Sequence, residues 1–110
     1  IKRRNISRSY LNMGKEIALH HHEKFDGSGY PYGLKGEEIP LSARIFALAD
    51  AYDAITSKRP YKDAIPHDEA VSRIASDSGT HFDPVIVRAF LNVAPEFANI
   101  NSKYSYNLHR

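Results

Sequence analysis

The sequence contains no cysteine, which excludes disulfides, zinc ribbons built on thiolates and thiol catalysis. No apolar run approaches the roughly 18 residues that cross a membrane, so no membrane segment is predicted. Charge of one sign is also scarce, since 15 basic and 13 acidic residues leave a formal charge of +2. So small a net charge does not predict a surface that binds polyanions broadly, and any nucleotide contact would come from a few individual cations.

What is present is typical of a globular domain or part of one, because 42% of the 110 residues are apolar and 25% are charged. Apolar spacing predicts helices over residues 11–23, 41–57 and 68–75, and a fourth helix that begins at Asp83-Pro84 and ends at Pro95. Asp83 and Pro84 suit the N-cap and the first helical position. No strand pattern of comparable length appears, so the predicted class is all-α. Residues 1–10 are expected to form a basic, solvated lead-in, and residues 99–110 a tail.

The segment 41–57 is apolar nearly all round, with one face formed by Ile45, Leu48, Tyr52 and Ile55. Such a composition predicts a central, buried helix. Asp50 interrupts it, and a buried carboxylate costs several kcal/mol unless it is paired or bound to a metal. Asp50 is therefore expected to have a partner.

Histidine is the unusual residue, because three of the six histidines form one run at positions 20–22. His21 and His22 follow Ile17 and Ala18 by four positions, so they are expected beside the buried stripe of their helix, just before a glycine-rich turn. Imidazole nitrogen together with carboxylate oxygen suits iron, manganese or zinc, whereas calcium prefers oxygen alone. Composition leaves open that these histidines are surface features or hydrogen-bonded core residues.

Residues 21–31 read HHEKFDGSGYP and reproduce the HHExxDGxGYP signature of HD-GYP domains at every defined position. The downstream blocks at residues 33–34, 36, 39–40, 43–45, 49–54, 59–62 and 82–84 also resemble that family. An eleven-residue motif with ordered downstream blocks is far more specific than a lone short pattern. The chain resembles the C-terminal half of an HD-GYP phosphodiesterase domain over residues 11–98. That resemblance implies a helical bundle of the HD-domain type, incomplete at its N-terminus.

The resemblance implies a metal-dependent phosphodiesterase that hydrolyses cyclic di-GMP, a bacterial second messenger, to a linear dinucleotide or GMP in the cytoplasm. By the same resemblance the metal ligands are His21, His22 and Asp50. Iron or manganese is expected as the metal, since the site would lie in a reducing cytoplasm. Supporting roles beside the ligands and the turn are expected for Glu23, Asp26 and Asp53.

Substrate contacts are also implied by the resemblance. Tyr30 corresponds to the tyrosine at the mouth of the substrate site, and Arg59 and Lys62 to cations that hold the phosphates of the cyclic dinucleotide. Arginine offers a bidentate fork and lysine a compact point charge, which together suit a phosphodiester.

Other histidines and acids are expected to be structural. His20 is a neighbour of the ligands, because the spacing to the GSGYP turn selects His21 and His22. His67-Asp68 follows Pro66 at a predicted helix start, so Asp68 is expected in a helix N-terminus. His81 lies in a predicted turn.

The family site also uses an upstream His-Asp pair, a lysine and further histidines that have no counterpart in this sequence. Three hypotheses therefore stay open: half of a catalytic domain, a catalytically inert interaction module that binds partner proteins through the GYP turn, and a phosphohydrolase for another nucleotide. Because the predicted central helix would lack its cover, we also expect the isolated chain either to self-associate or to be ordered only as part of a larger protein.

Overall fold

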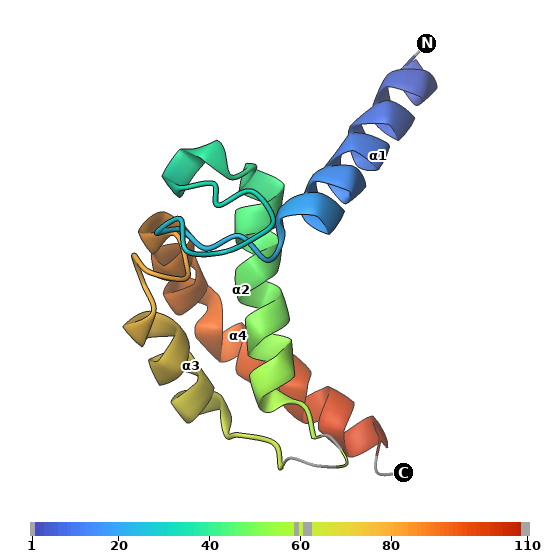
Figure 1. Ribbon diagram of the computed structural model, residues 1–110. Helices are drawn as coiled ribbons and strands as arrows, with labels where there is room; N and C mark the ends of the chain where they lie inside the picture. Colours follow the sequence, from blue (N-terminus) through green and yellow to red (C-terminus); the bar gives the residue numbers. More distant parts are fainter. Residues whose placement is uncertain (1, 59, 61–62, 109–110) are drawn as a thin grey trace.

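The computed structural model describes the backbone of residues 2–58, 60 and 63–108 and the side chains of residues 8–58, 60 and 63–99. In these residues the chain is helical and forms no strand, apart from an isolated bridge between Ser78 and Phe82, so the all-α prediction is confirmed. Its elements are α1 (Lys2–His20), the 3-10 helix η1 (Gly36–Glu38), α2 (Leu41–Thr56), α3 (His67–Ser76) and α4 (Pro84–Leu108) (Figure 1).

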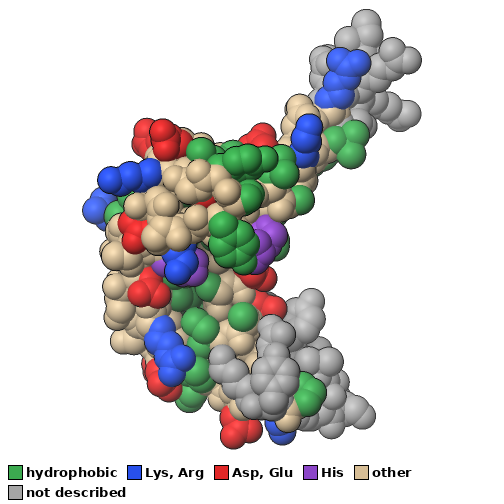
Figure 2. Space-filling model, in the orientation of Figure 1, with side chains coloured by type: hydrophobic (Ala, Val, Ile, Leu, Met, Phe, Trp, Pro, Cys, Tyr) green, Lys and Arg blue, Asp and Glu red, His purple; other side chains and the backbone are tan. Residues whose placement is uncertain are grey.

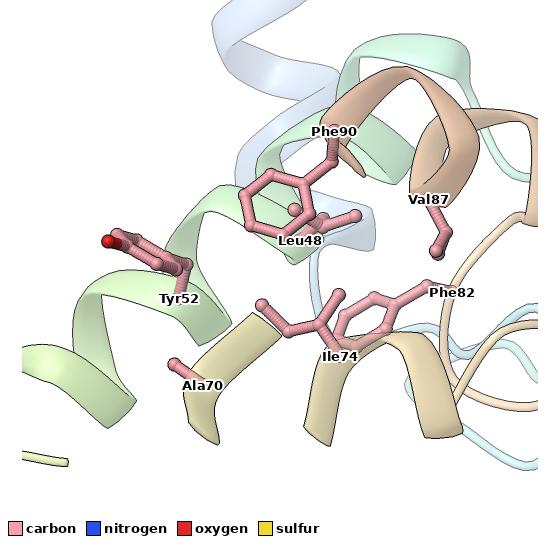
Figure 3. Packing of buried hydrophobic residues seen from close by; sticks show 7 residues of the cluster. All are labelled: Leu48, Tyr52, Ala70, Ile74, Phe82, Val87 and Phe90. Carbon is pink, nitrogen blue, oxygen red and sulfur yellow. The ribbon is translucent and has the colours of Figure 1, made fainter. Parts of the chain in front are cut away.

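The core lies where α2, α3 and the first half of α4 meet (Figure 3). It buries an aliphatic and aromatic cluster that comprises Leu48, Tyr52, Ala70, Ile74, Phe82, Val87 and Phe90. The Tyr52 hydroxyl lies 2.8 Å from Nδ1 of His67, so the polar end of this buried ring has a partner and so does the histidine at the start of α3. Asp68 lies in the first turn of α3, as predicted.

Helix α1 differs from the prediction at both ends. The expected lead-in at residues 1–10 is helical from Lys2 onward, and the helix projects away from the rest of the chain (Figure 1). Its other end stops at His20 rather than reaching residue 23. His21 still donates to the Ile17 carbonyl at 3.0 Å, but Glu23 donates to His20 at 3.0 Å, three residues back, which tightens the last turn and releases the chain into a loop.

Helix α4 also differs from the prediction, because it does not end at Pro95 but passes through it to Leu108. The predicted tail at residues 99–110 is therefore helical as far as Leu108. A proline inside a helix costs ~3 kcal/mol or more, through a lost hydrogen bond and a steric clash. Phe97 compensates: its ring lies 5.4 Å from Tyr52 and 5.3 Å from Phe90, so the turn after Pro95 is packed on the core.

Helix α2 ends at Thr56, within one residue of the prediction, but it is not covered all round. Leu48 and Tyr52 are buried, whereas Ile45 and Phe46 are 48% and 38% exposed. The expected burial of the whole helix is thus wrong for one face, and Asp50 is exposed on that face. Among the helices described, none is both long and apolar enough to span a membrane.

An ion pair joins the start of α2 to the start of α4. Asp83 caps α4 as predicted, because its Oδ1 accepts from the Val85 N–H at 2.8 Å. Its Oδ2 lies 2.6 Å from a guanidinium nitrogen of Arg44, and the two side chains are only 14% and 6% exposed. Arg44 Nε donates to the Ile39 carbonyl at 2.9 Å, so one guanidinium joins the start of α2, the loop before it and the start of α4.

Candidate active site

The candidate site lies in the loop that follows α1, where the chain folds back on itself. Gly29 allows this reversal, because a Cβ at position 29 would lie 2.5 Å from the His22 carbonyl oxygen and would also collide with the backbone nitrogen of Lys24. Tyr30 then donates its N–H to the same His22 carbonyl at 3.2 Å. The peptide bond between Tyr30 and Pro31 is cis. Gly29 of the motif is therefore required, because the backbone approaches too closely there for any side chain.

Glu23 is the buried charge of this loop. Its Oε2 accepts from the Tyr32 N–H and its Oε1 from the Leu34 N–H, both at 3.0 Å. The residue is 2% exposed, so both oxygens are satisfied by backbone donors rather than by water. Glu23 thus joins the end of the histidine run to a segment nine and eleven residues later.

Asp26 is exposed and closes the turn locally. Its Oδ1 accepts from the Ser28 hydroxyl at 2.6 Å and from the Ser28 N–H at 2.9 Å. These two bonds, the side-chain one first, lower the pKa of the Asp26 carboxyl. The Asp26 N–H donates to the Thr80 carbonyl at 2.9 Å, and the preceding Phe25 N–H to the His81 carbonyl at 3.1 Å. The loop is therefore fixed to the turn between α3 and α4.

His21 and His22 lie side by side at the start of the loop, with ring centroids 3.9 Å apart. Nδ1 of His21 lies 2.8 Å from the Ile17 carbonyl oxygen, which favours the tautomer that leaves Nε2 free to accept. The ring of His22 stacks on Tyr30 at 4.9 Å with an angle of 17° between the planes. The structure thus brings together three of the six residues predicted to be ligands or substrate contacts.

Asp50 belongs to the same region through α2. The ring of His21 contacts Phe46 edge-on at 5.6 Å, and Phe46 and Asp50 are four residues apart on one face of the helix. Asp50 makes no hydrogen bond or ion pair with the described part of the chain. Figure 2 shows histidine side chains at the surface next to hydrophobic ones. Even so, no group of three or more histidines and carboxylates in the described residues is close enough to hold a metal ion.

Two of the remaining predicted residues, Arg59 and Lys62, lie outside the described residues. Asp53 is exposed and accepts from the Ser57 hydroxyl at 3.1 Å, so it contacts the end of α2 rather than the histidines. His81 is half-buried in its turn and stacks on Phe82 at 4.1 Å. Burial lowers the pKa of His81 and the charge of Lys24 lowers it further, against the opposing effect of Asp77 and Asp26.

Sequence patterns did not indicate the contact between Glu23 and the two later amides, because backbone donors carry no residue signature. Sequence patterns also did not distinguish Arg44, which is largely buried, from the cations expected at the surface. The run Ile39 to Arg44 offered no sign that the guanidinium would be drawn inward by Asp83, 39 residues away.

Comparisons with known proteins identify the family of this chain. The family model described as HD domain matches residues 4–86. A probable cyclic di-GMP phosphodiesterase of Vibrio cholerae is 53% identical over 95 residues, which cover 86% of this chain and 22% of that protein. A cyclic di-GMP phosphodiesterase of Thermotoga maritima is 50% identical over 100 residues, covering 88% of this chain and 27% of that protein.

A solved structure is similar as well. It is the crystal structure of a cyclic GMP-AMP-specific phosphodiesterase of Vibrio cholerae, with a TM-score of 0.54 and 27% identity over 80% of this chain and 21% of that chain. The chain therefore spans only about a fifth to a quarter of the length of these relatives.

Proposed function

Since the chain belongs to the HD domain family, and its signature to the HD-GYP group, we propose that it forms part of a metal-dependent phosphodiesterase site that hydrolyses cyclic di-GMP. The observation that carries the proposal is the grouping of His21, His22 and Tyr30 next to the face of α2 that bears Asp50. Relatives about 50% identical over most of the chain are named cyclic di-GMP phosphodiesterases, which supports the substrate. The proposed activity is that of the whole protein that carries this chain. We also propose that this protein is cytoplasmic.

The donor chemistry of these residues fits a divalent metal such as iron or manganese. Ligating histidines commonly donate their second ring N–H to a backbone carbonyl, which fixes the ring and the tautomer. Nδ1 of His21 is engaged in this way by Ile17, which leaves Nε2 for the metal. Asp50 is exposed and makes no hydrogen bond or ion pair with the described residues, so its carboxylate can serve as a ligand. His21, His22 and Asp50 would hold the metal together with donors from outside the described residues.

A metal bound there would act as a Lewis acid on the phosphoryl oxygens and would lower the pKa of a bound water to near neutrality. The chain's own residues bind and orient the substrate. Tyr30, held against His22, presents an exposed ring at the mouth of the site, and the cations of Arg59 and Lys62 neutralise the phosphates. Water attacks phosphorus and the bond to the ribose oxygen breaks, which opens the ring to a linear dinucleotide. A second hydrolysis of the same kind gives GMP.

Arg59→Ala is expected mainly to raise KM for cyclic di-GMP, because it removes a phosphate contact present in both ground and transition states. A lost charge-assisted bond is worth about 1.5–3 kcal/mol, or roughly 10- to 100-fold. Steady-state kinetics of the protein that carries the chain measure this. Lys58→Ala, which removes an exposed cation next to Arg59, is the matched control and should leave KM unchanged. Equal kinetics for the two variants would mean that Arg59 does not contact substrate.

A second candidate substrate is cyclic GMP-AMP, because the similar crystal structure is of an enzyme named as specific for it. Assays of the two cyclic dinucleotides side by side discriminate these substrates. Activity on a simple chromogenic phosphodiester but on neither dinucleotide would favour a phosphohydrolase for another nucleotide. Absence of all activity would favour an interaction module that binds partners through the exposed Tyr30.

The exposed apolar side chains of α1 and α2 support a further part of the proposal, that the isolated chain self-associates. Leu19, Leu41, Ile45 and Phe46 are between 38% and 54% exposed, and apolar patches of this kind are commonly hidden by association. Sedimentation of the isolated chain should show a species larger than 12.4 kDa. Replacing Ile45 and Phe46 by serine should shift it toward monomer. A wild-type monomer with sharp cooperative unfolding would contradict the proposal.

A further inference from the structure

Glu23 occupies a position that neither metal binding nor substrate contact explains. Its side chain is fully buried, and burying a carboxylate is unfavourable unless hydrogen bonds replace the lost water. Here two backbone amides replace it, one on each oxygen. The carboxylate thus has two donors from one short segment, and both of its oxygens are used.

The segment it binds carries the exposed aromatic residues of the loop. Tyr30 is 62% exposed and Tyr32 is 65% exposed. Tyr30 is fixed on one side by its N–H bond to the His22 carbonyl, and Tyr32 on the other by Glu23. Because Glu23 directly follows His22, one short stretch of chain holds both ends of the segment.

His20, the histidine that the metal proposal leaves unused, completes this arrangement. Its ring lies 5.5 Å from the ring of Tyr32, and its Nδ1 lies 3.6 Å from Oε2 of Glu23. That nitrogen is buried and has no hydrogen-bond partner within the described residues. His20, the last residue of α1, therefore lies against both the Glu23 carboxylate and the ring of Tyr32.

We propose that Glu23 is a positioning residue for substrate binding, which holds residues 30–34 so that the rings of Tyr30 and Tyr32 stay open to the purine bases of a cyclic dinucleotide. Bases stack on exposed aromatic rings of this kind. Glu23 touches neither the substrate nor the metal and acts through the two tyrosines. The inference rests on the proposed function for its substrate, whereas its structural part, the clamp on the two amides, does not.

Glu23→Gln tests the clamp in the protein that carries this chain. Glutamine keeps the shape but offers one acceptor oxygen and one NH2 donor, so one of the two amide N–H groups loses its acceptor. We expect faster hydrogen exchange at the amides of residues 32 and 34, and a KM for the cyclic dinucleotide raised roughly tenfold or more, as for a lost charge-assisted bond. Bound metal should be unchanged and kcat should change far less than KM.

Glu38→Gln is the matched control, because Glu38 lies in η1, which follows the loop, and its Oε1 accepts one N–H, from Lys35 at 2.9 Å, at the exposed surface. It should leave KM and hydrogen exchange at residues 32 and 34 unchanged. If Glu23→Gln prevents folding, Glu23→Asp replaces it, since a side chain one methylene shorter keeps the charge but does not reach both amides.

Two results would overturn the inference: unchanged exchange at residues 32 and 34, or loss of metal with KM unchanged, which would make Glu23 a support of the ligands. Failure of the proposed function has a different signature. In that case the wild-type protein hydrolyses no cyclic dinucleotide, while Glu23→Gln still accelerates exchange at the two amides and thereby supports the clamp.

Discussion

His21→Ala and His22→Ala should each remove metal from the protein that carries this chain and reduce hydrolysis of cyclic di-GMP below detection. Each change deletes a proposed ligand that the structure places at the start of the loop, His21 against Phe46 and His22 against Tyr30. The lost ligand also leaves the water of the reaction without the activation that a metal supplies. Elemental analysis and a turnover assay measure the two effects, while circular dichroism should show the helical signal largely intact.

His20→Ala is the control for the register of the histidine run. His20 faces Glu23 and Tyr32, so its removal should leave the metal content unchanged even if KM responds. Undiminished metal in both His21→Ala and His22→Ala would refute the ligand assignment. Loss of metal in His20→Ala alone would shift the register by one or two residues.

Asp83→Ala should lower the free energy of unfolding by about 3–5 kcal/mol, because it leaves the largely buried guanidinium of Arg44 without its charged partner. It also removes the cap on the Val85 N–H, which adds to the loss. Denaturant unfolding of the purified protein measures the change.

Glu69→Ala is the matched control, since it removes an ion pair of the same kind with Arg73, in which the two side chains are 51% and 55% exposed. An exposed pair contributes about 0–1 kcal/mol, so the two variants should differ by several-fold in effect. Similar losses in both variants would mean that the burial of the Arg44–Asp83 pair is energetically unimportant.

Elements with a strong apolar pattern or a clear cap could be predicted from the sequence. The bounds of α2, the start of α3 and the cap at Asp83 fall within one residue of expectation, since apolar spacing and capping chemistry act locally. The start of α1 was missed because its first turns are polar and basic, although lysine and arginine are good helix formers. The end of α4 was predicted wrongly at Pro95, because the packing of Phe97 on the core, which supports the helix beyond the proline, depends on tertiary structure.

In the candidate site, His22 and Tyr30 belong to one continuous motif and their rings are stacked, while their proposed roles as ligand and substrate contact stay predictions. The exposure of Asp50 could not be foreseen, since apolar neighbours along a helix do not reveal which face the rest of the protein covers. Nor could the burial of Glu23, whose partners are main-chain amides.

The two bonds that fix the loop to the α3–α4 turn join main-chain atoms only, from Phe25 to His81 and from Asp26 to Thr80. Because the donors and acceptors are main-chain atoms, substitutions other than proline at Phe25 or Asp26 keep these two bonds. The side chain of Asp26 has a separate role, since it closes the turn with Ser28. The backbone of the loop and the backbone of the turn are thus joined directly. We expect a displacement of the turn after α3 to pull on the loop through these bonds, whereas the proposed ligand Asp50 belongs to a different element, α2.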